Sequence, residues 1–316
     1  MRFGYFLSSE EYPPDQLIEQ AQLAEEAGFT ALTISDHFHP WNDAQGQSPL
    51  VWSMIGALSQ ATSLPITTAV TCPIMRMHPA VVAQAAATSA VLTRGRFVLG
   101  VGTGEALNEH IIGHRWPNAE ARLEMLEEAV EVMRLLWTGE PVNHRGRHYR
   151  VENARIYTRT EEPPKVYVSA FGPRAMELAT RIGDGYISTR PEEDLVRRFR
   201  EGGGGRRPTV GLMKGCYAAS REEAVGIAHR LWATSGLPGE LSQLLPTPRH
   251  FEQAASLVTE DMTGKALACG PDSKAHLEFA SRYHDAGFDE LHVAAIGPHY
   301  RELIALYRDE VLPALA

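Results

Sequence analysis

The segment TISDHFHPW, residues 33–41, places an acid, two histidines and an indole directly after an apolar run. A histidine can take up a proton near neutral pH, and a nearby carboxylate can fix its tautomer and stabilise the cation. Asp36 and His37 are therefore candidates for proton transfer, and Trp41 is a candidate for contact with a flat ligand. The alternative is that Asp36 caps a turn, His37 is an ordinary satisfied polar residue and Trp41 fills the core.

A second candidate is GVGTGEALNE, residues 100–109. Gly100, Gly102 and Gly104 would let the backbone approach a flat or charged ligand closely, although the same glycines also suit a tight strand-to-helix turn. Glu105 lies among them and is a candidate acid, because a carboxyl group in a partly closed pocket can hold a proton for transfer.

Both segments belong to a chain in which short apolar runs alternate with segments of helical periodicity. This alternation predicts repeated β-α units and a parallel sheet. No GxGxxG fingerprint follows the first strand, so a (β/α)8 TIM barrel is favoured over a doubly wound nucleotide-binding sheet. The expected strands begin near eight positions: Phe3, Thr30, Ile66, Phe97, Val166, Tyr186, Val210 and Glu290.

In such a barrel, side chains at the carboxyl ends of the strands line the active-site mouth. Asp36, His37 and the 102–109 segment meet this condition. The other histidines lack the spacing of metal ligands, so no metal site is predicted. Further residues that follow predicted strands are Glu10, Ala69, Val70 and Cys72.

Two connections are longer than a barrel requires, residues 103–163 and about 218–263. Both are expected to overhang the mouth as part of a lid or a dimer surface. Residues 139–151 predict a β-hairpin. The glycine run at 201–208 predicts a flexible loop rather than a phosphate cradle, because no Lys-Ser/Thr pair follows it. Residues 1–316 are expected to form one domain.

The composition is that of a folded protein, with 44% of the 316 residues apolar and 22% charged. The net charge of −9 argues against a nucleic-acid or anionic-membrane surface over the whole molecule. Three cysteines without CxxC spacing predict neither disulfides nor a zinc site. We recognise no signal sequence and no apolar run of about 18 residues, so a soluble cytoplasmic protein is expected.

The chain resembles the luciferase-like, flavin- and deazaflavin-dependent barrel oxidoreductases, and within them the F420-dependent glucose-6-phosphate dehydrogenase group. The resemblance covers nearly the whole chain, and the combination of SDHFxPW with GTGEALNE is its most specific part. It implies a homodimeric dehydrogenase that transfers a hydride from a sugar, sugar-phosphate or other alcohol carbon to coenzyme F420. The segments that carry it are FGYFLSSEEYPP, SDHFHPW, MHPAVVAQAAAT, GRFVLGVGTGEALNE, GDGYI and AGFDELHV.

The resemblance also implies roles for single residues. His37 would take the proton of the substrate hydroxyl, Glu105 would protonate the reduced deazaflavin, and Trp41 would lie at its ring. Ala69-Val70 would form a cis peptide bond behind the ring, and Glu10 would be an acid on the substrate side. The remaining cofactor contacts would be Asp36, Cys72, Gly102, Thr103 and Asn108.

One departure from the group concerns the substrate. Where the group has a lysine for the sugar phosphate, this chain has Glu192, and a carboxylate there would repel a phosphate. Thr189 is retained and Arg190 lies nearby. Lys265 and Arg301 fall near the positions of the other phosphate-binding residues.

Another departure concerns the cofactor. Where the group has paired glycines for the cofactor phosphate, this chain has Phe171-Gly172, which leaves FMN open. Three hypotheses stand: an F420-dependent dehydrogenase, an FMN-dependent luciferase-like monooxygenase, and a cofactor-binding protein that has lost catalysis. Glu192 and Phe171 would be signs of the third. The expected partner is a small-molecule alcohol or sugar, with no nucleic acid and no membrane.

Overall fold

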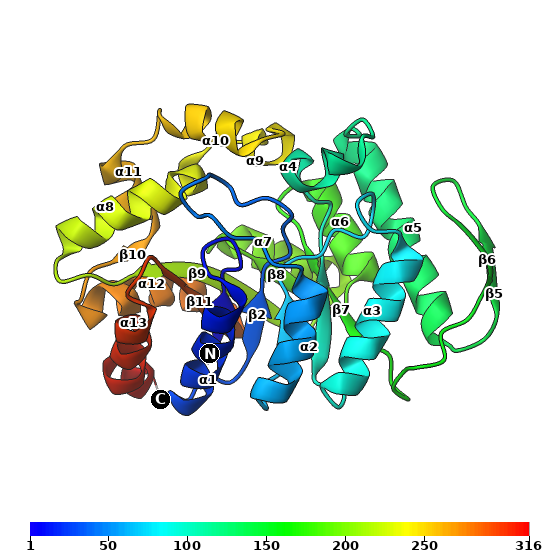
Figure 1. Cartoon of the computed structure of the whole chain (residues 1–316), viewed down its shortest axis with the longest axis horizontal. Coiled ribbons are helices and arrows are strands. Elements are labelled where there is room, and N and C mark those ends of the chain that lie inside the picture. The colour runs from blue at the N-terminus through cyan, green and yellow to red at the C-terminus, as the bar shows by residue number, and fades with distance from the viewer. Residues whose placement is uncertain (316) are drawn as a thin grey trace.

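The computed structural model describes residues 1–315, and within them eight parallel strands close into a barrel (Figure 1). The TIM-barrel prediction is confirmed, and each predicted strand start lies within two residues of the observed one. Pairing of the last strand with the first closes the barrel. In spatial order the strands are β1 (Arg2–Leu7), β2 (Leu32–Ile34), β3 (Ile66–Thr68), β4 (Phe97–Val101), β7 (Lys165–Ser169), β8 (Gly185–Ser188), β9 (Thr209–Cys216) and β11 (Glu290–Ile296).

Helices surround the barrel because each parallel strand needs a crossover to reach the next one. The first helix begins at Pro14, which suits a first-turn position, and Gly28 just beyond its end has a φ of 92°. The surrounding helices are α1 (Pro14–Glu26), α2 (Val51–Ala61), α3 (Pro79–Leu92), α5 (Ala119–Trp137), α6 (Pro173–Ile182), α7 (Glu193–Phe199), α8 (Arg221–Trp232), α12 (Ser273–Asp285) and α13 (Tyr300–Leu306), the last continued by η4 (Tyr307–Val311) and α14 (Leu312–Ala314).

One layer of the barrel interior consists of apolar side chains from alternate strand positions. Above them, toward the carboxyl ends of the strands, buried side chains become polar: Ser8, Glu10, Ser35 and Asp36. The apolar layer separates these polar groups from the opposite end of the barrel. It consists of Phe6, Tyr167, Ile187, Val210, Leu212 and Ala294.

The two long connections differ in where they lie. Helices α9, α10 and α11 lie across the top of the barrel in Figure 1, as predicted, whereas the predicted hairpin lies on the flank beside α5. His144 holds the hairpin against α5, because its Nε2 atom lies 3.1 Å from Oε1 of Glu128 on that helix. These segments are α4 (Ala106–Glu109), η1 (His110–Ile112), β5 (Val142–Arg145), β6 (Arg150–Ala154), η3 (Ala233–Gly236), α9 (Leu241–Leu244), α10 (Pro248–Ala255), α11 (Glu260–Ala266) and β10 (Ala268–Cys269).

The glycine run that predicted a flexible loop is partly helical. Helix α7 continues into the π-helical segment η2 (Arg200–Gly204), where Gly203 has a φ of 117°. Arg207 stabilises this segment by donating to the carbonyl oxygens of Thr180 and Gly204. The loop prediction was therefore wrong over 201–204, because tertiary hydrogen bonds outweigh the low helix propensity of glycine.

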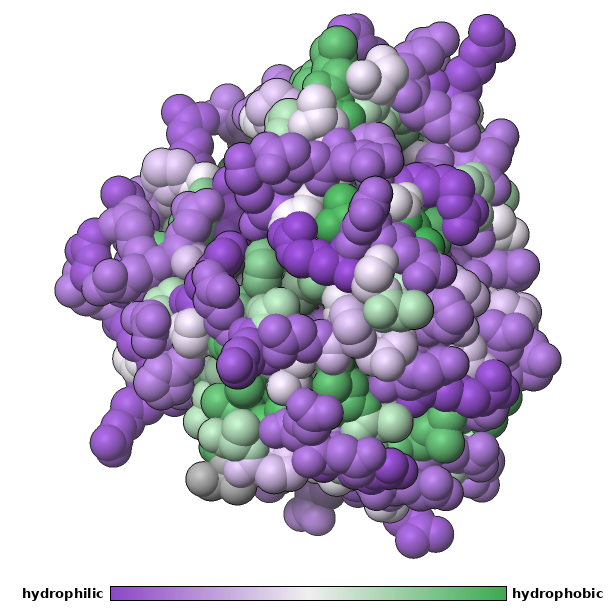
Figure 2. Space-filling view, turned by 90° about the vertical axis from the view of Figure 1, so that its left-hand side faces the viewer, coloured by the Kyte–Doolittle hydropathy of each residue, from purple (hydrophilic) through white to green (hydrophobic). Residues whose placement is uncertain are grey.

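Figure 2 shows the face on the left-hand side of Figure 1. This face is mainly hydrophilic, and its hydrophobic residues lie in scattered groups rather than in one continuous band. Within residues 1–315, every helix is too short or too polar to cross a bilayer.

Candidate functional site

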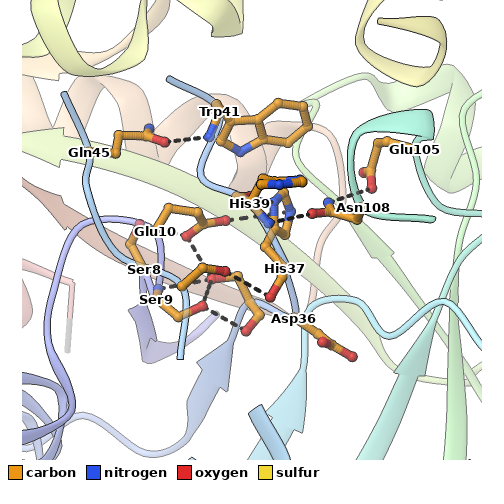
Figure 3. A network of polar contacts seen from close by, with 12 residues as sticks. Ser8, Ser9, Glu10, Asp36, His37, His39, Trp41, Gln45, Glu105 and Asn108 are labelled. Atoms are coloured by element: carbon orange, nitrogen blue, oxygen red, sulfur yellow. Dashed lines mark hydrogen bonds and ion pairs between the residues drawn. The ribbon is translucent and has the colours of Figure 1, made fainter. Parts of the chain in front are cut away.

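The centre of the candidate site is His37, which follows β2 at the mouth of the barrel (Figure 3). Its Nε2 atom lies 3.5 Å from Glu10 Oε1, and the two side chains are only 9% and 3% exposed. Its ring lies against Trp41, with 4.9 Å between ring centroids, and Trp41 in turn meets Phe251 of α10 edge to face at 5.1 Å. An imidazole–carboxylate pair is thus enclosed under aromatic side chains.

The hydrogen bonds of His37 identify its basic nitrogen. Nδ1 lies 3.2 Å from the carbonyl oxygen of His39, which can only accept a hydrogen bond. In the neutral ring Nδ1 therefore carries the hydrogen, and Nε2 is the nitrogen that can take a proton. Glu10 is held to face it, because its other oxygen accepts from Ser8 at 3.0 Å and from Ser35 at 2.7 Å.

The side chain of Asp36 has different partners from that of its neighbour His37, because successive side chains at a strand end point in opposite directions. It accepts hydrogen bonds from Thr71 at 2.8 Å and from the Arg76 guanidinium at 2.7 Å. Arg76 also donates its backbone N–H to Glu109 at 2.7 Å. Burial raises the pKa of Glu109 to about 7, although the bond from Arg76 lowers it. The carboxylate that faces His37 is thus Glu10, not Asp36.

Glu105 is tied to the loop that carries His37 (Figure 3). Asn108 Nδ2 donates to Glu105 Oε2 at 3.4 Å, and Asn108 Oδ1 accepts from the backbone N–H groups of Phe38 and His39 at 2.9 and 3.1 Å. One buried amide therefore fixes the proposed acid relative to the proposed base.

The glycines after β4 allow close packing against the segment after β3. A Cβ on Gly102 would lie 2.8 Å from Val70 Cγ2, and one on Gly104 would lie 2.4 Å from Cys72 Sγ. The Ala69-Val70 peptide bond is cis, as predicted. These two segments, with Thr103 beside Gly102, form a closely packed wall next to Glu105.

The Phe171-Gly172 segment leads into α6. No side chain caps that helix, and a Cβ on Gly172 would meet nothing within 4 Å. The first-turn N–H groups of a helix attract anions. The Arg190 guanidinium lies 4.9 Å from the Phe171 ring centroid, so a cation accompanies this helix start.

The residues predicted to bind a substrate phosphate are dispersed, and their charges are already paired. Arg190 and Glu192 lie 3.7 Å apart on the surface, Lys265 pairs with Asp261, and Arg301 pairs with Glu19. Thr189 is exposed and accepts a hydrogen bond from Tyr283 through its backbone oxygen. None of these residues forms an ion pair with Glu10 or with His37.

Several side chains at the mouth were missed from the sequence. Arg76 and Phe251 are distant in sequence from the residues they contact, so no local pattern indicated them. Lys214 on β9 did carry a signal, because a lysine inside the apolar strand TVGLMKGC is unusual. Its Nζ atom lies 4.3 Å from the ring centroid of Trp232, whose Nε1 donates to Glu11.

Comparison with known proteins agrees with this geometry. The luciferase-like monooxygenase family matches residues 1–290. An F420-dependent glucose-6-phosphate dehydrogenase from Microbacterium testaceum is 37% identical, over 100% of this chain and 97% of its own length. A solved F420-dependent secondary alcohol dehydrogenase in complex with an F420-acetone adduct is 32% identical, with a TM-score of 0.92 over 100% of this chain and 99% of that one.

Monooxygenases of known structure are more distant. RslO1 from Streptomyces bottropensis is 20% identical, with a TM-score of 0.77 over the full length of both chains, which is a likeness of fold. The full-length relatives at higher identity instead bear out the resemblance found in the sequence. The chain belongs to the luciferase-like monooxygenase family, and the match over residues 1–290 contains the first seven barrel strands and both candidate segments.

Proposed function

We propose that the protein is an F420-dependent dehydrogenase that oxidises the CH–OH group of a small alcohol or sugar. The observation that carries this proposal is the enclosed pair of His37 and Glu10, in which Nε2 lies 3.5 Å from a carboxylate oxygen. An alcohol loses a hydride readily only when its hydroxyl proton is withdrawn at the same time. The names of the full-length relatives support the same reaction class and the same cofactor.

The residues present fit a flat, anionic cofactor. The wall of Val70, Cys72 and Gly102 is apolar and closely packed, as the face of a tricyclic ring requires. The uncapped start of α6 at Gly172 offers backbone N–H groups for a phosphate. F420 bound there would supply the hydride acceptor.

The chain's own groups would manage the protons. His37 takes the hydroxyl proton at Nε2, and Glu10 stabilises the positive charge that forms on the imidazole. Trp41 and Phe251 keep water away from this pair. Glu105, held by Asn108, holds the proton that the reduced cofactor takes up.

An unphosphorylated substrate fits the charges better than a sugar phosphate. Arg190, Lys265 and Arg301 are each engaged by a carboxylate. A phosphate would have to displace Glu192, Asp261 or Glu19 from these exposed pairs.

The test is to titrate the purified protein with F420 and with FMN, and to follow reduction of the bound cofactor with a panel of secondary alcohols, glucose and glucose 6-phosphate. The proposal expects tight F420 binding and alcohol-dependent bleaching of the deazaflavin. Retention of FMN with oxygen uptake would support a monooxygenase instead, and F420 binding without turnover of any alcohol would indicate a protein that has lost catalysis.

We propose further that the protein acts in the cytoplasm as a homodimer. The three cysteines are free and buried, which suits a reducing compartment. Helix α3 exposes three apolar side chains, Val81, Val91 and Leu92, which a second copy could cover. Light scattering after gel filtration tests the dimer, and a monomeric mass at micromolar concentration would exclude it.

A further inference from the structure

The strongest unassigned group at the mouth is Lys214. The chain has four lysines, and the other three, Lys165, Lys265 and Lys274, are exposed. Lys214 pairs in register with Ala294 of the barrel interior, and Leu212, two residues earlier on the same strand face, belongs to the same apolar layer. Its side chain therefore extends from the interior of the barrel toward the polar groups at the mouth.

The Lys214 ammonium has no acceptor in the described part of the chain. Its Nζ atom faces the ring of Trp232, 4.3 Å from the ring centroid. Burial lowers its pKa, while the charges of Glu10 and Glu11 act in the opposite direction. An ammonium group has three N–H donors, and leaving them unsatisfied in a partly buried position is costly.

The two neighbouring carboxylates have other partners in the described structure. Glu10 receives Ser8 and Ser35 on one oxygen and faces His37 with the other. Glu11 accepts from Trp232 on one oxygen and from the Gly297 N–H at 2.9 Å on the other. The donors of Lys214 are thus left for a ligand.

The surrounding charge limits what that ligand can be. The negative charge of an ionised Glu10 cancels the positive charge of Lys214, and Glu11 adds a second carboxyl group. A phosphate dianion would therefore meet no net positive charge. An uncharged oxygen can accept from the ammonium without opposing these carboxylates. Trp232, whose ring the ammonium faces, belongs to an apolar cluster against which Trp41 also packs.

We propose that Lys214 is a specificity-determining residue that donates a hydrogen bond to a second, uncharged hydroxyl of the substrate while the reacting hydroxyl lies at His37. The substrate class is therefore a diol or an unphosphorylated sugar. This inference rests on the proposed dehydrogenase function and deepens it.

The test uses two alcohols that differ by one hydroxyl, 2-propanol and propane-1,2-diol. The wild-type enzyme, Lys214→Met and Lys214→Arg are compared by the ratio of kcat/KM for the diol to that for the monohydric alcohol. Lys214→Met is expected to lower this ratio about 10- to 100-fold, the size of one hydrogen bond to a charged group. Lys214→Arg should recover part of it. Lys274→Met, at an exposed lysine, is the matched control and should leave the ratio unchanged.

Three outcomes would overturn the proposal. An unchanged ratio in Lys214→Met would show that the ammonium does not contact the second hydroxyl. An equal loss with both alcohols would indicate only electrostatic support of Glu10. If Lys214→Met lowers the ratio of kcat/KM for glucose 6-phosphate to that for glucose more than it lowers the diol ratio, Lys214 belongs to an anion site.

A second readout does not depend on turnover. Acetylation of Lys214 in the F420-loaded protein is followed by peptide mass spectrometry, and propane-1,2-diol should slow it at concentrations at which 2-propanol does not. Equal protection by both alcohols would contradict the assignment. If no alcohol is oxidised at all, the dehydrogenase proposal fails, while the protection experiment still decides the role of Lys214.

Discussion

Replacing Glu10 with glutamine removes the charge that faces His37 and keeps the shape of the side chain. The amide oxygen of the introduced glutamine can still accept from Ser8 and Ser35, so the substitution is expected to leave the local fold intact. What is lost is the interaction between the carboxylate and the positive charge that forms on the imidazole during proton transfer.

The size of this loss follows from the geometry. Two unit charges 3.5 Å apart attract by about 5 kcal/mol at an effective dielectric constant of about 20. The cost of desolvating a buried pair offsets part of this attraction, and hydrogen bonds to charged groups contribute about 1.5–3 kcal/mol net. Glu10→Gln should therefore slow cofactor reduction about 10- to 100-fold.

The assay is stopped-flow reduction of F420 by saturating alcohol, with cofactor affinity measured separately by fluorescence quenching. Affinity should change less than about threefold, because the hydrogen bonds and the ion pair of Glu10 go to Ser8, Ser35 and His37 rather than to the wall of Val70, Cys72 and Gly102. A reduction rate equal to that of the wild-type enzyme would refute the argument that Glu10 stabilises the charged imidazole.

Other predictions concern stability, the cofactor wall and the substrate. Burial raises the pKa of Glu109 from 4.5 to about 7, so its contribution to stability is present below about pH 4.5 and is lost as the pH rises through about 7. In urea unfolding, Glu109→Gln should reduce this pH-dependent loss of stability by at most about 3 kcal/mol. Parallel pH profiles of the variant and the wild-type protein would contradict this prediction. Gly104→Ala should weaken F420 binding, because Gly104 has a φ of 70° and the new Cβ would lie 2.4 Å from Cys72 Sγ. Gly113→Ala controls for backbone strain, because Gly113 has a φ of 83° and open space around it. Equal effects of the two substitutions would show that the contact with Cys72 plays no part. Glu192→Lys should raise kcat/KM for glucose 6-phosphate relative to glucose, because it frees Arg190 and adds a cation; an unchanged ratio would mean that no substrate anion approaches this place.

The fold could be predicted because periodicity is a local signal. Alternation of apolar runs with helical segments located all the barrel strands, even the three-residue β2 and β3. Where tertiary contacts decide the backbone, prediction failed, as in the glycine run that Arg207 holds in a π-helical turn.

The candidate site was predictable only in part. The position of His37 and Glu105 at strand ends placed them at one mouth, and the Ala69-Val70 cis bond followed from the family resemblance. Which carboxylate meets His37 depends on how β1 and β2 pair, and the adjacency of Asp36 and His37 in the sequence did not decide it. Lys214 was overlooked because its strand was interpreted for its apolar residues.

The most direct test of the central claim is the rate of F420 reduction in His37→Ala at saturating alcohol. If Nε2 of His37 takes the hydroxyl proton, the rate should fall by about 100-fold or more, while the F420 dissociation constant stays within about threefold of the wild-type value. Reduction at the wild-type rate with an unchanged dissociation constant would show that the imidazole takes no part in the proton transfer.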